Sequence, residues 1–371
     1  MRSRNRWRAL KMNSRKTRRI MVGGVAVGGG APVSIQSMTN TDTRDAAATL
    51  AQIDRLAAAG CQIVRCAVPD AAAAESLRAI VAGSPLPVVA DIHFDHRLAL
   101  MSIASGVAAV RINPGNIGSE SGVRAVAEAA GEAGIPIRIG ANSGSISPEL
   151  RKKLPTGADG VCEGLVSSAL EQCAMLEKYG FHAIKVSLKA SSVPVTVAAC
   201  RAFAGRTDYP LHIGVTEAGT RERGIIKSAV GIGALLLEGI GDTIRVSLTA
   251  DPVEEIYAAV RILEAAGLRD AAPDLVSCPT CGRTAVDLVG LAGRVERYVD
   301  ECRAAGKHFS LRKIAVMGCV VNGPGEANDA DLGMAGGNGK FVIFKSGKIV
   351  ATLPENEAWA AFKAELDRHL V

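Results

Sequence analysis

The sequence predicts an α/β protein, with an N-terminal (β/α)8 TIM-type barrel followed by a smaller α+β domain. The barrel is predicted by eight short runs rich in β-branched residues between residues 33 and 248, which alternate with Ala-rich amphipathic segments. Eight strand–helix units in about 250 residues match this barrel. The second domain is predicted because the alternation stops at a Pro-containing joint, residues 268–275.

The eight predicted strands can be read in order along the chain. They are VSIQSM at 33, IVRCAV at 63, VVADIHF at 88, AVRINP at 109, IPIRIG at 135, AIKVSLKAS at 183, LHIGVTEA at 211 and TIRVSL at 243. Helices are predicted at 44–59, 72–82, 119–133, 163–179, 221–238 and 252–266. The longer gap between the fifth and sixth strands predicts additional structure around residues 145–165.

After the joint, the elements follow a different order. A strand is expected to reach Cys278, a helix to span 284–305, and the run KIAVMG to lead into Cys319. FVIFKSGKIVATL predicts a hairpin that turns at Ser346-Gly347, and a final helix begins at about 355. We therefore expect three parts: a basic, flexible extension at 1–19, a TIM-type barrel at 20–268 and an α+β domain at 269–371.

The net charge of +6 comes from the N-terminus. Residues 1–19 hold seven Arg, two Lys and no acid, so subtracting nine from +6 leaves −3 for the rest of the chain. We therefore expect no nucleic-acid partner, although nucleic-acid binding by the basic tail is an alternative. The sequence contains no run of about 18 apolar residues, so it predicts no membrane span. The nine cysteines include many without regular spacing, which favours a reducing cytoplasm over a disulfide framework.

Three cysteines and one glutamate in the second domain predict a metal site. Cys278 and Cys281 have C-x-x-C spacing, which can place two thiolates on one metal centre, and Cys319 follows 38 residues later in MGCVVNGPGEA. Iron–sulfur clusters are usually held by four thiolates, so three leave one iron for an oxygen ligand. Glu326 is the candidate for that ligand. It follows a Gly-Pro-Gly turn, in which the backbone can fold close to a bulky cofactor.

A structural zinc site is the alternative, because zinc also accepts thiolates and His308 could supply a fourth ligand. The protein would then be a phosphate-binding lyase or transferase with a zinc appendage. No second C-x-x-C or His pair follows at the spacing of a zinc ribbon or finger, and a closed site has no use for the N-G-P-G-E loop. We therefore favour an iron–sulfur cluster.

Polar residues occupy the C-terminal halves of the predicted barrel strands, where an ordinary barrel interior prefers branched aliphatic side chains. They are Arg65, Asp91, His93, Arg111, Asn113, Arg138, Asn142, Lys185, Ser187, His212, Glu217 and Arg245. Pairs such as Asp91 and His93 are two residues apart, so each pair faces one side of its strand. We expect these side chains to converge at the catalytic face.

Five cations gathered at that face would repel one another unless a multivalent anion compensates them, which predicts a phosphate or diphosphate ligand. For Arg245, a salt bridge that closes the barrel is the alternative. The loop NPGNIG at 113–118 adds backbone N–H groups suited to phosphate. Gly231-Ile232-Gly233 does not complete G-x-G-x-x-G, because Leu236 occupies the last position, so no nicotinamide or flavin site is expected.

Several longer motifs belong together. They are IQSMTNT (35–41), VADIHFDHR (89–97), RINPGNIG (111–118), TEAG (216–219), EGIGDTIRVSL (238–248), ADPVEEI (250–256), CPTC and GCVVNGPGEA. From about residue 18 to 353, the chain resembles the bacterial 4-hydroxy-3-methylbut-2-enyl diphosphate synthase family of the non-mevalonate isoprenoid pathway. The resemblance implies a barrel followed by a [4Fe-4S] domain, without a large insert between them.

The resemblance also implies an activity. The expected enzyme is a cytoplasmic iron–sulfur oxidoreductase that reduces 2-C-methyl-D-erythritol 2,4-cyclodiphosphate by two electrons, opening the ring and losing a hydroxyl as water. One [4Fe-4S] cluster per subunit would be held by Cys278, Cys281, Cys319 and Glu326. A flavodoxin or a ferredoxin would donate electrons. The family further implies a homodimer in which the cluster domain of one subunit covers the barrel of the other.

In the barrel, the resemblance assigns the diphosphate contacts to Arg65, Arg111, Arg138, Asn142 and Lys185. Glu217 matches a carboxylate near the reacting carbon, and it could protonate the departing oxygen if burial raises its pKa. The other polar residues of the strand ends are expected in the same substrate site: Asp91, His93, Asn113, Ser187, His212 and Arg245.

Overall fold

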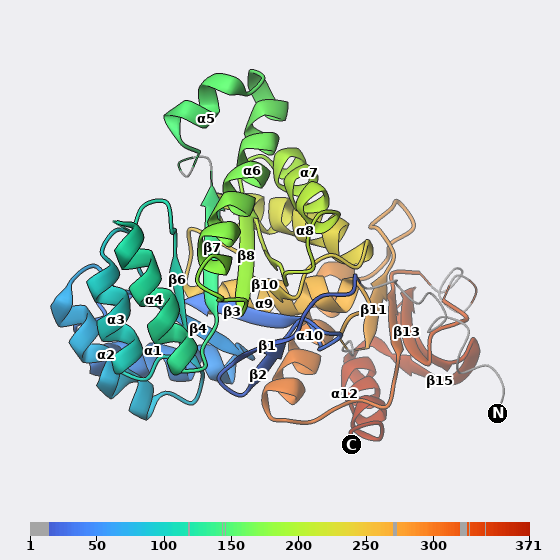
Figure 1. Ribbon diagram of the computed structural model, residues 1–371. Coiled ribbons are helices and arrows are strands. Elements are labelled where there is room, and N and C mark those ends of the chain that lie inside the picture. Colours follow the sequence, from blue (N-terminus) through green and yellow to red (C-terminus); the bar gives the residue numbers. More distant parts are fainter. Residues whose placement is uncertain are drawn as a thin grey trace. The chain divides into compact units, whose positions relative to one another are not determined.

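The computed structural model of the 371-residue chain describes residues 15–117, 119–142, 144, 146–269, 273–319, 325, 327–337 and 339–371. The chain divides after Leu268 into two compact units, Met1–Leu268 and Arg269–Val371 (Figure 1). Each unit has its own sheet and its own hydrophobic core. Each therefore has the internal packing of a domain.

Eight parallel strands form the barrel of the first unit, and they are the eight that the sequence predicts. They are β3 (Ser34–Met38), β4 (Ile63–Ala67), β5 (Val88–Asp91), β6 (Ala109–Ile112), β7 (Ile137–Asn142), β8 (Ile184–Lys189), β9 (His212–Ile213) and β10 (Thr243–Ile244). The sheet order is β8-β7-β6-β5-β4-β3-β10-β9. A parallel bridge between Val186 and Leu211 brings its two ends together. The TIM-type barrel is therefore confirmed.

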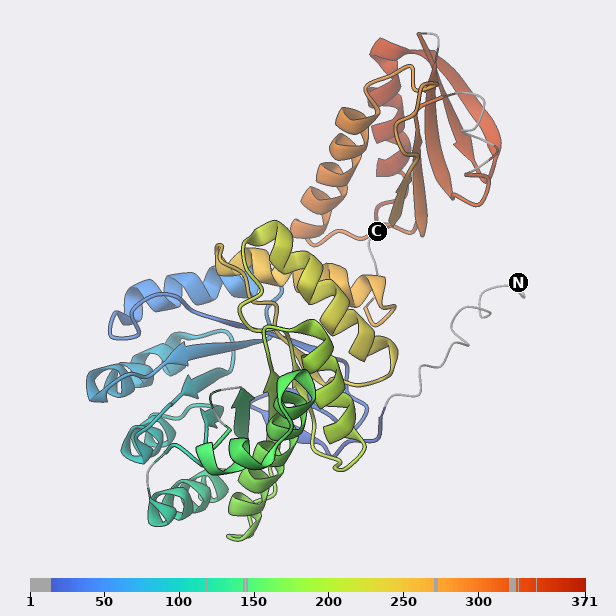
Figure 2. The same cartoon turned by 90° about the horizontal axis from the view of Figure 1, so that it is seen from above.

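The helices of this unit lie outside the strands (Figure 2). They are α1 (Ala46–Ala58), α2 (Ala71–Gly83), α3 (His96–Ala104), α4 (Glu120–Glu132), α5 (Pro148–Lys153), α6 (Gly157–Glu177), α7 (Val193–Ala204), α8 (Arg221–Leu237) and α9 (Pro252–Ala265). The additional structure predicted around residues 145–165 consists of α5 and the first turns of α6. No helix in the described part of the chain is long and apolar enough to span a membrane.

Two of these helices, α3 and α7, are absent from the sequence prediction. α3 has only nine residues, which gives a short periodic pattern. α7 contains Val193, Val195, Thr196 and Val197, and β-branched residues have low helix propensity. Val195 and Phe203 of α7 are buried in the barrel core. Packing against the sheet therefore stabilises α7 where local propensity does not.

The N-terminal end of the barrel is closed by a hairpin, which the sequence analysis did not predict. The strands β1 (Ile20–Val22) and β2 (Val25–Val27) pair antiparallel. Their apolar side chains form one buried cluster with residues from the beginnings of three barrel strands: Ile20, Val22, Val27, Ile63, Val89 and Ala109. This plug is apolar, whereas the opposite end of the barrel interior is polar.

The part of the predicted flexible extension that the structure describes, residues 15–19, is bound to the barrel. The Arg15 side chain donates hydrogen bonds to the carbonyls of Ala204 and Tyr209, both at 3.0 Å. Arg18 pairs with Asp208, and its guanidinium lies 3.9 Å from the centre of the Tyr209 ring. Residues 1–14 lie outside the described residues.

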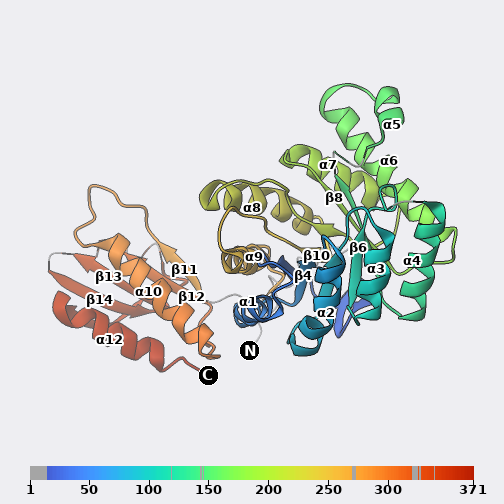
Figure 3. The same ribbon diagram turned by 90° about the vertical axis from the view of Figure 1, so that its left-hand side faces the viewer.

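The second unit is a five-stranded mixed sheet in the order β11-β12-β13-β14-β15. The strands are β11 (Asp274–Ser277), β12 (Lys313–Met317), β13 (Leu332–Gly337), β14 (Lys340–Lys345) and β15 (Lys348–Pro354). The helices α10 (Leu288–Ala304) and α12 (Glu355–Asp367) share one core cluster on one face of the sheet (Figure 3). The predicted α+β domain is therefore present, and β13 is its one described strand that the sequence analysis did not predict.

Candidate functional site

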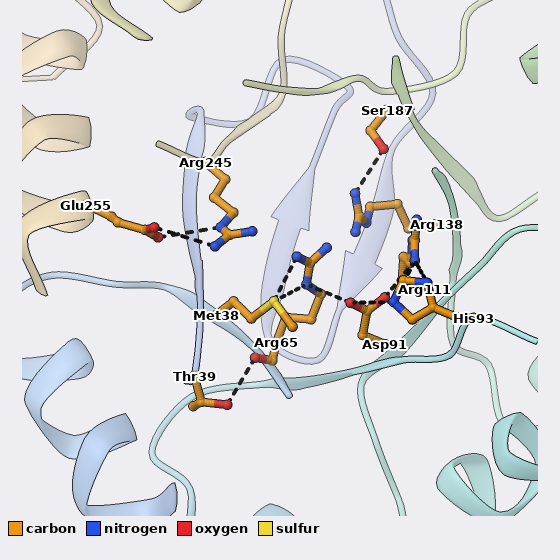
Figure 4. A network of polar contacts seen from close by, with 10 residues as sticks. All are labelled: Met38, Thr39, Arg65, Asp91, His93, Arg111, Arg138, Ser187, Arg245 and Glu255. Atoms are coloured by element: carbon orange, nitrogen blue, oxygen red, sulfur yellow. Dashed lines mark hydrogen bonds and ion pairs between the residues drawn. The ribbon is translucent and has the colours of Figure 1, made fainter. Parts of the chain in front are cut away.

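A polar cavity of about 140 Å3 lies at the carboxyl ends of the barrel strands. Eight of the twelve polar residues predicted for this face line it: Arg65, Asp91, His93, Arg111, Arg138, Asn142, Ser187 and Arg245. Figure 4 draws these side chains except that of Asn142 and shows that they come together from several different strands. Five further residues complete the lining: Gly140, Ala141, Lys189, Thr216 and Ser247.

The strand register brings the charged residues together. Asp91 is paired with Arg111, Arg111 with Arg138, and Arg138 with Lys185 across β5, β6, β7 and β8. Paired residues in a parallel sheet point to the same face. Because Asp91, Arg111 and Arg138 line the cavity, that face is the barrel interior.

Asp91 is the central anion of the cavity. Its carboxylate lies 3.1 Å from Nη1 of Arg111, 3.5 Å from Nε of Arg65 and 3.6 Å from Nε2 of His93. Burial by itself would raise the pKa of Asp91, but Arg65, the His93 hydrogen bond and Arg111 outweigh that effect and hold the pKa well below its usual range. Asp91 is therefore ionised and organises the cations around it.

Cations outnumber carboxylates in the cavity. Arg138 donates one hydrogen bond, from Nη1 to the Ser187 hydroxyl at 2.9 Å, while its Nε and Nη2 are buried with no hydrogen-bond partner among the described residues. Burial lowers the pKa of Arg138, and Arg65 and Arg111 lower it further. Burial also lowers the pKa of Arg65 to about 10, against the opposing effect of Asp91. Buried cations with free donors favour an anionic ligand with several oxygens.

Two glycines make this crowding possible. A Cβ atom at position 140 would lie 2.7 Å from Nε and Nη2 of Arg111. A Cβ atom at position 214 would lie 2.9 Å from Nζ of Lys189 and 2.3 Å from the carbonyl oxygen of Arg245. Gly140 and Gly214 therefore leave the volume that the cationic side chains occupy.

The lysine that lines the cavity is Lys189, which the sequence analysis missed. Lys185 is 2% exposed and does not line the cavity. Its Nζ has no hydrogen-bond partner among the described residues. Burial, and to a smaller extent the charge of Arg138, lowers the pKa of Lys185 to about 7. Lys189 lies four residues further toward the carboxyl end of β8. Burial, then Arg138 and Arg245, lower the pKa of Lys189. The sequence pattern could have identified Lys189, because Lys189 lies two residues after Ser187 and therefore on the same face of the strand.

Three other predicted residues also lie outside the cavity lining: His212, Asn113 and Glu217. His212 is 1% exposed, and both of its ring nitrogens lack a hydrogen-bond partner among the described residues. Burial, and after it the charge of Lys189, holds the pKa of His212 well below its usual value. Asn113 accepts a hydrogen bond from the Gly115 amide at 3.1 Å and so orders the loop after β6.

Glu217 follows the cavity residue Thr216, but its side chain is exposed and its backbone has φ +52°, in the left-handed region. The barrel by itself therefore does not provide the burial that was expected around Glu217. A non-glycine residue in this region is strained by about 1–3 kcal/mol, and such residues are enriched at functional sites.

In the second unit, the three predicted thiols lie at the carboxyl ends of adjacent parallel strands. Cys278 and Cys281 follow β11, and Cys319 follows β12. The Gly318 amide donates a hydrogen bond to the Cys278 sulfur at 3.3 Å. Hydrogen bonds from the backbone and side chain of Arg283 lower the pKa of the Cys281 thiol. Both interactions favour thiolates, which are the form that binds metal.

These thiols fit an iron–sulfur cluster by donor type and by strand position, because three soft ligands leave a fourth position open. All nine cysteines are free. Within the described ranges, no three His, Cys, Asp or Glu side chains are gathered closely enough to hold a metal ion. Glu326, the predicted fourth ligand, lies outside the described residues, as do residues 320–324.

Comparison with known proteins identifies the family. The family model described as the GcpE TIM-barrel domain matches residues 17–260 of this chain, and the family model described as the GcpE protein C-terminal domain matches residues 274–368. A protein of Geobacter sulfurreducens named 4-hydroxy-3-methylbut-2-en-1-yl diphosphate synthase (flavodoxin) is 56% identical over 357 residues, which cover 96% of this chain and 98% of that protein. A Clostridium perfringens protein of the same name is 54% identical over 93% of this chain and 97% of its own length. The chain therefore belongs to the GcpE family.

Proposed function

We propose that this protein is a 4-hydroxy-3-methylbut-2-en-1-yl diphosphate synthase that acts on 2-C-methyl-D-erythritol 2,4-cyclodiphosphate. In this reaction the substrate takes up two electrons and two protons. A ring C–O bond breaks and its oxygen stays on the diphosphate, a hydroxyl leaves as water, and a carbon–carbon double bond forms. Family membership supports this activity.

The observation that carries the proposal is the convergence of cations around Asp91 at the barrel mouth. Arg65, Arg111, Arg138, Lys189 and Arg245 line one cavity, and an ionised diphosphate would compensate their charge. The diphosphate would receive hydrogen bonds from the donors of Arg138 that lack a partner among the described residues. The substrate carbons would then lie toward the mouth of the cavity, near Thr216 and the exposed Glu217.

The first unit would thus be the substrate-binding domain and the second unit the cluster domain. Cys278, Cys281 and Cys319, with Glu326 as fourth ligand, would hold one [4Fe-4S] cluster per subunit. When bound, the cluster supplies the electrons that no amino-acid side chain can supply. Glu217 remains the candidate proton donor, on the condition that a covering partner buries it.

The names of these two relatives support flavodoxin as the electron donor. Ferredoxin is the alternative, and parallel assays with the two reduced donors would separate them.

We further propose a homodimer, which size-exclusion chromatography with light scattering would test. A cytoplasmic location agrees with nine free cysteines.

Anaerobic purification followed by an activity assay tests the function. With reduced flavodoxin, the protein should convert the cyclodiphosphate to the linear diphosphate, which 31P NMR detects. The purified protein should also contain iron. Arg138→Ala is the control, because it should lose turnover while keeping its iron. A protein that contains zinc and no iron, or an iron-loaded protein that leaves the cyclodiphosphate unchanged, would contradict the proposal.

A further inference from the structure

Glu255 is a buried carboxylate on α9 that contacts the cavity residue Arg245 (Figure 4). We propose that Glu255 is a positioning residue, which holds the guanidinium of Arg245 at the wall of the cavity so that it can bind the diphosphate. This inference rests on the proposed diphosphate site. Glu255 is not among the residues that line the cavity, so it would act on the ligand through Arg245.

The contacts of Glu255 fix its carboxylate in place. The side chain is 4% exposed. Oε2 accepts a hydrogen bond from the Ser37 hydroxyl on β3 at 3.0 Å, and Oε1 accepts one from the Leu248 amide after β10, also at 3.0 Å. Both donors come from the barrel sheet and its loops. The carboxylate is therefore anchored independently of Arg245.

The same two oxygens face one edge of the Arg245 guanidinium. Nε lies 3.5 Å from Oε2, and Nη2 lies 3.5 Å from Oε1. An arginine held along its Nε–Nη2 edge keeps its Nη1 free for another acceptor. The arrangement thus orients Arg245 and leaves it able to bind an anion in the cavity.

Arg245 requires such an anchor because its neighbours repel it. It is one of the positive groups that, after burial, lower the pKa values of Arg65, Arg138 and Lys189. Without an opposing negative charge, this repulsion would move the Arg245 side chain toward solvent. Glu255 supplies that charge at a position fixed by the sheet, which favours a preorganised site.

A purely structural role is the competing explanation, in which Glu255 only attaches α9 to β3 and β10. The two roles differ in how the effect of Glu255 depends on Arg245. If Glu255 positions Arg245, its removal should matter only while Arg245 is present. If Glu255 only stabilises the barrel, its removal should have the same effect with or without Arg245.

The experiment is a double-mutant cycle with inorganic diphosphate as the probe, measured by isothermal titration calorimetry on the full-length, cluster-loaded protein. Glu255→Gln should weaken diphosphate binding on the order of tenfold, a size common for coupled neighbours. In the Arg245→Gln background, Glu255→Gln should have no further effect on affinity. Glu255→Asp, which keeps the charge, should recover part of the loss. Glu254→Gln is the matched control, because this adjacent α9 carboxylate pairs with the exposed Arg221 and should leave affinity unchanged.

A second readout needs no ligand. Glu255→Gln should increase the rate at which phenylglyoxal modifies Arg245, measured by mass spectrometry of the modified peptide. Equal diphosphate affinities for the wild type and Glu255→Gln, or equal losses in both Arg245 backgrounds, would overturn the positioning role while leaving the diphosphate site in place. A wild-type protein that binds no diphosphate would overturn the site itself, and the role of Glu255 with it.

Discussion

Lys185 and Lys189 lie on the same face of β8, yet only Lys189 lines the cavity. Lys189→Ala should therefore weaken diphosphate binding by about 1.5–3 kcal/mol, the usual contribution of a hydrogen bond to a charged group. Lys185→Met, which keeps the length of a fully buried side chain, should change the affinity much less. Calorimetry with inorganic diphosphate checks both variants. The reverse order of effects would return the ligand role to Lys185.

Lys185 should also make stability depend on pH. Its pKa is about 7 in the folded protein, and an unfolded lysine has a pKa of about 10.4. Between these values the unfolded chain binds more protons, so the contribution of Lys185 to the free energy of unfolding rises with pH. Below pH 7 its full penalty is present.

Lys185→Met removes this penalty. The variant should be more stable than the wild type at pH 7, and the difference should shrink as the pH approaches 10. Denaturation of both proteins at pH 7 and pH 9.5 measures it. A stability difference that does not vary with pH would mean that Lys185 titrates normally in the fold.

The three thiols should be separable from the cavity by mutation. Replacing Cys278, Cys281 or Cys319 with Ser should abolish iron binding and reductase activity, because a hydroxyl is a poor substitute for a soft thiolate. Diphosphate binding should persist in each variant, since the cavity lies in the other unit. Iron analysis and calorimetry measure the two properties. Full iron loading in all three variants would remove these cysteines from the cluster assignment.

Among the elements, β13 depends most on its surroundings. Its sequence, LGMAGG, contains three glycines, which weaken a strand interior. The structure explains two of them: a Cβ atom at Gly333 would lie 2.2 Å from Cζ of Phe344, and one at Gly336 would lie 2.5 Å from Cε1 of Phe341. The glycines therefore accommodate aromatic rings from β14.

Gly333→Ala should consequently destabilise the second unit by about 1–3 kcal/mol, the usual cost of overpacking a core. Gly24→Ala is the control, because no atom of the described residues, apart from its two chain neighbours, lies within 4 Å of its added Cβ, and its backbone is not in the left-handed region. Thermal unfolding followed by circular dichroism compares the two. Equal melting temperatures for Gly333→Ala and the wild type would show that the Phe344 ring moves aside at little cost.

For the whole molecule, the proposed homodimer predicts complementation between subunits. Arg138→Ala should inactivate the barrel, and Cys319→Ser should inactivate the cluster domain. If the cluster of one subunit serves the barrel of the other, mixed dimers of the two variants contain one functional pair. Mixing after dissociation should then restore about a quarter of the wild-type activity, since half of the dimers are mixed and each has one working site. No recovery in verified mixed dimers would place both functions within one subunit.

The sequence by itself determined the barrel, its eight strands and the residue types of the cavity. Period-two spacing is local, so it showed which residues share a face of a strand, and eight of twelve predicted residues line the cavity. The C-x-x-C pair with Cys319 likewise marked the thiol loops, and both family models match where these patterns occur.

The tertiary structure decided how deep each residue lies. Spacing gives the face of a strand but not the depth of a residue along the barrel axis, which depends on how the tilted strands are staggered around the barrel. Lys185 and His212 lie outside the cavity lining, although Lys185 is the register partner of the cavity residue Arg138, and Lys189 lies within it. Glu254 and Glu255 are adjacent acids on α9. Only the packing of α9 shows that Glu254 forms an exposed ion pair with Arg221, whereas Glu255 is buried against Arg245. β13 likewise became a strand because aromatic rings of β14 pack where its glycines lack side chains. Such properties arise from contacts between residues that are distant in the sequence, and local patterns do not encode them.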